Sequence, residues 1–482
     1  MRGFLASSIG VTCTAALCLP LVLPAGAQAA VARSAAPVSA RSDSAAAAGS
    51  TQSLPLAPLG QGRALRDGAG VRDQGIAPRD VRPFSLVGVI WDDADAELHG
   101  RVQVRTRAAD TADWSDWQDV ETHNSEHAAD PGSAERESGE RRGATAPLWV
   151  GASDGVEVRV RAEEPSDGGQ PSDAGQASAE RAQLPDGLRL ELVDPGADPV
   201  RPADTTATAT ATATLPRVLR DDPQSQGAQT EAAAPLTAEA AASSAVNAQL
   251  APLGALVIPA LSKEETEADL AAARGEIAGK PYIGPRPGII TRKGWGADER
   301  LRERSFLYTK TVKAAFVHHT ATGNNYSCAQ APALLRAIYR YHTLSSGWRD
   351  FGYNFAIDKC GNIYEGRAGG VTKPVMGAHT LGFNSNTTGI AVLGTYTSKK
   401  PPTAALNAVA KLTAWKLGLF GRNPEGTTSL TSGGSNLHAK GKNVRLNVIS
   451  GHRDGFATEC PGRQLYGKLG TARSTSARLQ GR

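Results

Sequence analysis

Between about Arg82 and Pro195, apolar and polar residues alternate with a period of two. The alternation is clear in the stretches FSLVGVIW, GRVQVRTR, PLWVG, GVEVRVRA and LRLELVDPG. Successive side chains of a strand point to opposite faces, so this pattern predicts half-buried strands joined by polar loops. We therefore expect a small all-β, sandwich-like domain over residues 76–197. Trp114 and Trp117 lie within it, and either core or edge packing or a platform that stacks sugars would explain them.

Two segments beside this domain lack an apolar period. Residues 30–75 are rich in Ala, Ser, Gly and Pro, and we expect them to be disordered. Residues 198–284 contain the run TTATATATAT and a weakly helical, Ala-rich stretch. Because such sequences cannot form a packed core, we expect a low-complexity linker there.

From Pro285 to the end, the pattern is that of a globular unit. The stretches VKAAFVHHT, TTGIAVLGTYT and NVISGHRD are typical of strands, and FGYNFAIDKCGNIYEG predicts two strands around a turn. The stretches CAQAPALLRAIYRYHT, PPTAALNAVAKLTAWKLGLFG and CPGRQLYGKLGTAR predict helices. This mixture over residues 285–482 predicts an α/β domain, with a mixed β-sheet covered by helices.

Two histidines stand side by side in the first of these strands. His318 and His319 must point to opposite faces of a sheet, so they cannot ligate one ion from the same side. One of them is a candidate ligand, and the other needs a different explanation.

Charge divides the chain into two parts. Residues 285–482 contain 28 Lys and Arg against 9 Asp and Glu, whereas residues 1–284 contain 24 against 39. A strongly basic body is attracted to polyanions, such as nucleic acid or the anionic wall of a bacterium.

The N-terminal residues decide between these two targets. A basic start, an apolar stretch and an A-x-A exit at Ala27 and Ala29 predict a signal peptide over residues 1–29. An uncleaved anchor is the alternative, because the apolar run approaches the length of a membrane span. We expect a secreted, cell-wall-associated protein that binds no nucleic acid and is not an integral membrane protein once the signal is removed.

Three cysteines remain after the signal peptide, namely Cys328, Cys360 and Cys460. Because the number is odd, one of them must be free, intermolecular or metal-bound. His452 and Cys460 lie eight positions apart in SGHRDGFATECPG, and a loop that folds back could bring both to one point. With His318 they would form a His-His-Cys set, which suits zinc with one open position. The alternative is a buried His452 that hydrogen-bonds Asp454 or the backbone.

Six segments resemble, in order and spacing, the family of peptidoglycan recognition proteins and N-acetylmuramoyl-L-alanine amidases. They are TRKGWGADE, FVHHTAT, GWRDFGYNFAID, GNIYEGR, GAHTLGFNSNTTGIAVLG and SGHRDGFATECPG, within about residues 285–470. The resemblance implies that His318, His452 and Cys460 bind Zn²⁺, and that His319 is structural. It also implies a catalytic role for Tyr353, for which a core tyrosine is the alternative.

The resemblance leaves the general base open. Thr458 stands where some members have a catalytic Lys, and its hydroxyl can donate to an oxyanion but carries no charge. The resemblance further implies substrate contacts at His379, Asn384 and Arg367, although His379 could instead be a turn or core residue.

With Cys460 as a metal ligand, Cys328 and Cys360 are left to form a disulfide in an exported protein.

These features together predict a secreted zinc amidase that cleaves the amide between N-acetylmuramic acid and L-alanine in peptidoglycan. Its expected partners are bacterial peptidoglycan and anionic wall polymers. The first alternative is a non-catalytic peptidoglycan-binding protein, although binding-only relatives typically lack the zinc Cys. The second is a structural or adhesive surface protein dominated by the β domain and its spacer.

Overall fold

The computed structural model describes residues 49–59, 73–137, 140–163, 183–199, 236–274 and 281–482. All of these residues belong to one unit of the chain. The expected signal peptide and most of the first expected disordered segment lie outside the described residues. Within the described ranges, none of the helices combines the length and the apolar character needed to cross a bilayer.

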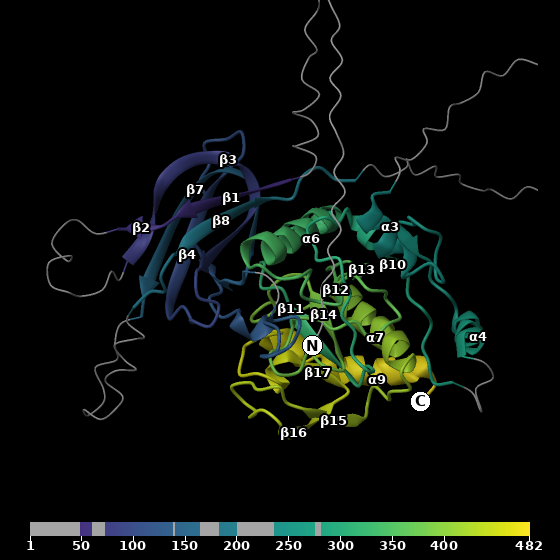
Figure 1. Ribbon diagram of the computed structural model, residues 1–482. Helices are drawn as coiled ribbons and strands as arrows, with labels where there is room; N and C mark the ends of the chain where they lie inside the picture. Colours follow the sequence, from purple (N-terminus) through teal and green to yellow (C-terminus); the bar gives the residue numbers. More distant parts are fainter. Residues whose placement is uncertain (1–48, 60–72, 138–139, 164–182, 200–235, 275–280) are drawn as a thin grey trace, which may run out of the picture. The chain divides into compact units, whose positions relative to one another are not determined.

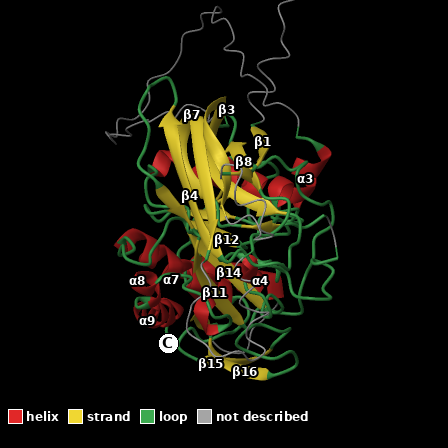
Figure 2. Cartoon of the chain, turned by 90° about the vertical axis from the view of Figure 1, so that its left-hand side faces the viewer, coloured by secondary structure: helices red, strands yellow, loops and turns green. Residues whose placement is uncertain are grey.

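The alternating segment forms an eight-stranded antiparallel sheet, as the pattern predicts (Figures 1 and 2). Its main path runs β1-β8-β3-β7-β4-β5, and β2 and β6 both pair with β3. The strands are β1 (Ser50–Pro55), β2 (Ala57–Pro58), β3 (Asp73–Trp91), β4 (Gly100–Ala108), β5 (Gln118–Val120), β6 (Gly143–Ala144), β7 (Leu148–Ala162) and β8 (Arg189–Asp194).

The core of this first domain consists of the inward side chains of its strands. Val87 and Val89 of β3, Val102 and Val104 of β4, and Leu190 of β8 belong to one buried cluster. Burying an aliphatic side chain of this size contributes about 1.5–3 kcal/mol, so the period-two pattern is also the pattern of stabilisation.

The two neighbouring tryptophans lie beside β5, the last strand on the path of the first sheet, and not in its core. Trp114 and Trp117 are half-buried and lie outside the core cluster of the first domain. The Arg159 guanidinium lies 4.0 Å from the centre of the Trp117 ring, and that of Arg105 lies 5.4 Å from the Trp114 ring. Both rings therefore pack against cations at the surface of the sheet.

The structure differs from the expected disorder of residues 30–75. Residues 50–55 form β1, which pairs with β8 over six residues, and the Gln52 side chain donates to the Arg82 carbonyl at 2.8 Å. The surrounding sequence is rich in Ala and Ser, so its composition does not predict this strand, which forms one edge of the sheet.

The structure also differs from the expected linker over residues 236–274 and 281–284, whereas residues 200–235, with the TTATATATAT run, and 275–280 lie outside the described residues. The described part contains α3 (Ala238–Ala245), β9 (Val257–Ile258) and α4 (Lys263–Arg274). The Thr237 side chain caps α3, and the Asn247 amide donates to the Glu365 carboxylate at 2.8 Å. These residues belong to the C-terminal domain because that domain supplies the apolar and polar partners that the segment itself lacks.

The C-terminal domain is built on a seven-stranded mixed sheet with the order β17-β11-β14-β12-β13-β10-β9. The neighbours of β11 and the β12-β14 and β10-β13 pairs are parallel, whereas β12-β13 and β9-β10 are antiparallel. Its strands are β10 (Ile289–Ile290), β11 (Ala314–His319), β12 (Phe355–Ile357), β13 (Ile363–Glu365), β14 (Thr387–Val392) and β17 (Ile449–Gly451), and β15 (Thr427–Thr431) and β16 (Asn443–Asn447) form a separate hairpin.

Helices cover the sheet through two different apolar clusters. Alternate residues Ile390 and Val392 of β14 pack with α7 (Thr403–Gly418) and α9 (Leu469–Gln480), and the short α8 (Arg463–Tyr466) precedes α9. The intervening Ala391 packs with α6 (Ala331–Arg340), and α5 (Arg292–Trp295) lies in the same cluster. The expected α/β domain with a mixed sheet and covering helices is thus confirmed (Figure 1).

The first domain shares a core with the second one. Leu86 and Trp149 of the first sheet belong to the same buried cluster as Leu334 and Ile338 of α6. The Tyr341 hydroxyl, just after α6, lies 3.1 Å from the Thr145 carbonyl. The contact between the domains is therefore apolar and buried, and the order of the two domains along the chain gave no sign of it.

A disulfide joins Cys328 to Cys360, with their Cα atoms 6.2 Å apart, as expected from the sequence. Cys328 begins a short 3-10 helix before α6, and Cys360 lies in the turn between β12 and β13. The bond thus connects the helical layer to the sheet.

Replacing both cysteines by serine should lower the free energy of unfolding by about 2–4 kcal/mol, because the unfolded chain is no longer restricted by the closed loop. Guanidinium unfolding followed by tryptophan fluorescence would measure the change. Wild-type protein unfolded in a reductant should match the variant, and an unchanged unfolding midpoint would contradict a structural role for this bond.

Candidate metal centre

His318 is the penultimate residue of β11, at the carboxyl end of a central strand. It is fully buried, and its register partner on β14 is Ala391. Val317 belongs to the cluster under α7 and α9, so His318 points to the opposite face of the sheet. The neighbouring His319 faces away from it, and its Nδ1 accepts a hydrogen bond from the Tyr396 amide at 3.1 Å. His319 therefore has a structural role, because it binds the Tyr396 backbone on the other face of the sheet.

His452 follows β17, which runs parallel to β11 and ends at Gly451. Because the carboxyl ends of parallel strands meet at one edge, the His318 and His452 ring centres lie 4.6 Å apart. Asp454 does not bond the His452 ring: its carboxylate accepts from the Gly451 amide at 2.9 Å and from the Tyr466 hydroxyl at 2.6 Å. Asp454 therefore fixes the turn that aims His452 at His318.

Cys460 returns to the same point through the loop after His452. The Arg453 amide donates to the Cys460 carbonyl at 3.0 Å, which closes the loop. The Cys460 sulfur accepts from the His319 amide at 3.4 Å and lies 3.8 Å from Nδ1 of His318. The loop thus folds back as the sequence analysis requires, and Cys460 is a buried free cysteine.

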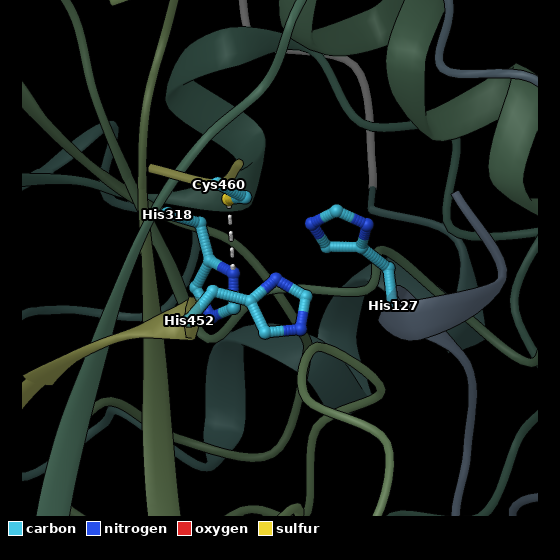
Figure 3. A group of neighbouring side chains, drawn as sticks. All are labelled: His127, His318, His452 and Cys460. Atoms are coloured by element: carbon cyan, nitrogen blue, oxygen red, sulfur yellow. Dashed lines mark hydrogen bonds between the residues drawn. The ribbon is translucent and has the colours of Figure 1, made fainter. Parts of the chain in front are cut away.

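A fourth residue, His127, joins this group from the first domain (Figure 3). It ends the short 3-10 helix η2 (Ser125–His127), between β5 and β6. Its ring centre lies 4.5 Å from that of His452 and 5.5 Å from that of His318. One ligand atom from each of His127, His318, His452 and Cys460 lies within 4.8 Å of every other.

The sequence analysis missed His127. It lies in a polar loop of a β domain, and no local pattern connects such a loop with a strand of another domain. The packing of the first sheet on α6, together with contacts of the loop itself, brings His127 to the candidate metal centre.

The surroundings of the four residues favour a metal ion. Burial lowers the pKa of His127 to about 4 and those of His318 and His452 well below the usual value. The imidazoles are therefore neutral at pH 7 and carry lone pairs that can bind a metal. Burial raises the pKa of the Cys460 thiol, which would lose its proton on binding a metal.

The ring nitrogens of His127 and His452 also lack hydrogen-bond partners among the described residues. Among the described residues, no hydrogen bond of normal geometry reaches either ring nitrogen of His127 or of His452, although the backbone of Asn124 and of Glu126 lies near them. Buried polar atoms without partners are costly, and a cation would satisfy them. Three imidazoles and one thiolate are ligands that zinc prefers, so these residues fit a zinc ion.

Tyr353 lies beside the cluster, just before β12. Its ring centre is 5.3 Å from that of His318 and 5.9 Å from that of His127. Burial raises the pKa of its phenol, so the hydroxyl keeps its proton and can act as a hydrogen-bond donor. Tyr353 is thus both buried in the core and adjacent to the metal ligands.

Thr458 also lies at the cluster, two residues before Cys460. Its hydroxyl oxygen accepts from the Cys460 amide at 3.1 Å, and the hydroxyl donates to the Glu126 carboxylate of the first domain at 2.9 Å. In this conformation its proton is therefore directed to the first domain.

His379, the first of the expected substrate contacts, lies beside the candidate metal centre in this conformation. It is fully buried, and its Nδ1 lies 3.0 Å from the Thr380 hydroxyl, which in turn lies 3.4 Å from Nε2 of His318. This chain of polar contacts leaves Nδ1 of His318 facing the Cys460 sulfur. His379 therefore supports a ligand and orients it.

Asn384 and Arg367, the other two expected substrate contacts, both meet the first domain. The Asn384 amide donates to the Ala128 carbonyl at 3.0 Å and to the Asp130 carboxylate at 2.8 Å. The Arg367 guanidinium lies 2.7 Å from the Glu135 carboxylate. In this conformation both side chains are therefore directed to the first domain.

A cavity of about 890 Å³ borders one side of the metal centre. Residues of both domains line it, among them Glu121, His127, His319, Thr458 and Cys460.

The comparisons with known proteins match each domain separately. The family described as "Rv3811 N-terminal galactose-binding domain-like" matches residues 37–185, and the family described as "N-acetylmuramoyl-L-alanine amidase" matches residues 308–463. Peptidoglycan-recognition protein SC2 of Drosophila melanogaster is 32% identical over 185 residues, which are 38% of this chain and 85% of that protein. The human N-acetylmuramoyl-L-alanine amidase is 31% identical over 222 residues, which are 45% of this chain and 33% of that protein.

Solved structures show the same partial coverage. Drosophila PGRP-LB is 26% identical with a TM-score of 0.30, and the match covers 38% of this chain and 92% of that one. Peptidoglycan recognition protein-LE in complex with tracheal cytotoxin is 30% identical with a TM-score of 0.31, and the match covers 38% and 92%.

The donor set predicts that the purified protein holds about one zinc ion per chain. Cys460→Ala and His452→Ala should each lose most of this metal after dialysis against a weak chelator, because removal of one of the four candidate ligands weakens binding. Elemental analysis would measure the bound zinc, with His99→Ala, in the loop just before β4, as the control. Full zinc content in Cys460→Ala would exclude the cysteine as a ligand.

Proposed function

Because the chain belongs to the family of peptidoglycan recognition proteins and N-acetylmuramoyl-L-alanine amidases, we propose that it is a zinc-dependent amidase. Its substrate would be the amide that joins the lactyl group of N-acetylmuramic acid to L-alanine of the peptidoglycan stem. The observation that carries this proposal is the convergence of His318, His452 and Cys460 at the end of one sheet. Peptidoglycan binding without catalysis is the alternative within the same family.

The zinc ion, held by His318, His452 and Cys460, would supply a Lewis acid that polarises the scissile carbonyl and lowers the pKa of a water molecule. Tyr353 keeps its phenolic proton and would donate a hydrogen bond to the oxyanion of the tetrahedral intermediate. Thr458 would act in the same way once its hydroxyl is released from Glu126. Thr380 and His379 hold His318 so that its Nδ1 faces the Cys460 sulfur, from which position it would bind the metal.

The presence of Cys460 in the cluster supports an enzyme over a protein that only binds peptidoglycan. A catalytic zinc keeps three protein ligands and one open position, and the cysteine is buried within reach of His318 as the third ligand of such a set. Relatives that only bind peptidoglycan typically lack this cysteine.

We also propose that the protein acts outside the cell, at a bacterial wall. The disulfide between Cys328 and Cys360 supports this location, because such bonds persist in oxidising compartments. The excess of Lys and Arg over residues 285–482 supports attraction to anionic wall polymers, which would weaken as salt is added.

The test is the release of stem peptides with a free L-alanine amine from purified peptidoglycan. Tyr353→Phe should lower kcat by about 10²-fold while it keeps its zinc, because one donor to the oxyanion is lost. Cys460→Ala should lose both activity and metal, and His99→Ala should match the wild type.

Two results would contradict the proposal. One is the release of stem peptides by Cys460→Ala when that variant holds no zinc. The other is a lack of release both from the zinc-loaded wild type and from the variants of the first domain described below, under conditions in which peptidoglycan still binds.

A further inference from the structure

We propose that residues 121–137 of the first domain form an intramolecular inhibitor, in which His127 is the fourth zinc ligand and acidic side chains occupy the substrate-binding groups. This segment, called the inhibitory loop below, contacts four of the polar groups on which the amidase would depend. The inference rests on the proposed function for its consequence, but its structural part can be tested by itself.

His127 would close the coordination sphere of the metal. A catalytic zinc keeps three protein ligands and one open position, whereas a site with four protein ligands is closed. The ring of His127 is buried against those of His318 and His452, and its nitrogens have no partner of normal geometry among the described residues. With His127 bound, no position remains for water or for the scissile carbonyl.

Glu126, the neighbour of His127, accepts a hydrogen bond from the hydroxyl of Thr458. The donor-to-acceptor distance is 2.9 Å, and the Glu126 side chain is almost completely buried. Its backbone carbonyl also accepts from the Leu381 amide at 2.8 Å. A carboxylate oxygen thus lies where the developing oxyanion of a substrate would need this hydroxyl.

Asp130 continues the contact along the segment after His379. Its carboxylate accepts from the Asn384 amide at 2.8 Å and from the Gly382 backbone amide at 2.7 Å. The Ala128 carbonyl accepts from the same Asn384 side chain at 3.0 Å. The inhibitory loop therefore accepts hydrogen bonds from the Gly382 amide and the Asn384 side chain, beside the bond that Glu126 accepts from Leu381.

Glu135 completes the contact at the far end of the inhibitory loop. Its carboxylate lies 2.7 Å from the Arg367 guanidinium and 3.6 Å from that of Arg349. Glu135 and Arg367 are both buried, so the pair is protected from salt. Three acidic residues of the inhibitory loop thus meet the strongly basic C-terminal domain, which agrees with the opposite charges of the two parts of the chain.

The position of the inhibitory loop is fixed from outside the metal centre. It is bounded by β5 and β6, and β6 pairs with β3 of the first sheet. That sheet packs on α6 through Leu86 and Trp149, and the Tyr341 hydroxyl meets the Thr145 carbonyl next to β6. The same apolar contact that joins the domains therefore presents His127 to the metal, and separation of the domains would open the site.

The experiment uses the full chain with cobalt(II) in place of zinc and azide as a small exogenous ligand. In the wild type, azide should leave the visible absorption of cobalt unchanged, because no coordination position is open. In His127→Ala, azide should shift the spectrum. His127→Gln provides a second variant with a similar volume, should the smaller side chain disturb folding.

A second set of variants separates the acidic contacts from the metal ligand. Glu126→Gln combined with Asp130→Asn and Glu135→Gln should give an intermediate azide response, since His127 remains but is held less firmly. Glu137→Gln is the matched control, because Glu137 is an exposed carboxylate of the same loop, and it should behave as the wild type. Release of stem peptides should rise by about 5- to 150-fold in His127→Ala.

The outcomes distinguish the two proposals. If azide shifts the wild-type spectrum as strongly as that of His127→Ala, the inhibitory loop does not close the site, and the inference is overturned. If the variants gain the azide response but none releases stem peptides, the closure holds and the proposed amidase function fails. If the wild type already releases stem peptides at the rate of His127→Ala, the loop is not an inhibitor and the inference is overturned. The proposed amidase function would still hold in that case.

Discussion

The parallel pairing of β11 with β17 is the constraint on which the metal centre depends. It brings the carboxyl ends of both strands to one edge of the sheet, so that His318 and His452 meet although they are far apart in the sequence. Asp454 then holds the turn after β17, and the loop to Cys460 returns the sulfur to the same edge. Without this register, His318 and His452 would not lie close together.

The sequence predicts much of this arrangement, but not all of it. The period of two in β11 separates His318 from His319, and the resemblance to a known family assigns the first of them to the metal. The alternation in β3, β4, β7 and β8 predicts the first domain as a sheet. In contrast, β1 and α3 lie in segments whose composition suggests disorder, because each acquires its partners only from strands or side chains distant in sequence.

The sequence could not predict the contacts of His379 or the position of His127, for related reasons. A motif places His379 near the substrate groove, but its fully buried ring lies against Thr380 and supports His318 instead. His127 has no motif at all, and its position follows from the buried contact between the first sheet and α6. Tertiary packing, and not local pattern, decides both.

The two domains thus combine three ligands and a tyrosine that suit catalysis with a loop that covers them. X-ray absorption at the zinc edge of the full-length protein would show which atoms bind the metal. We expect three nitrogen donors and one sulfur donor, with the sulfur at about 2.3 Å from zinc. A zinc ion without a sulfur neighbour, or one surrounded by oxygen donors alone, would contradict this expectation.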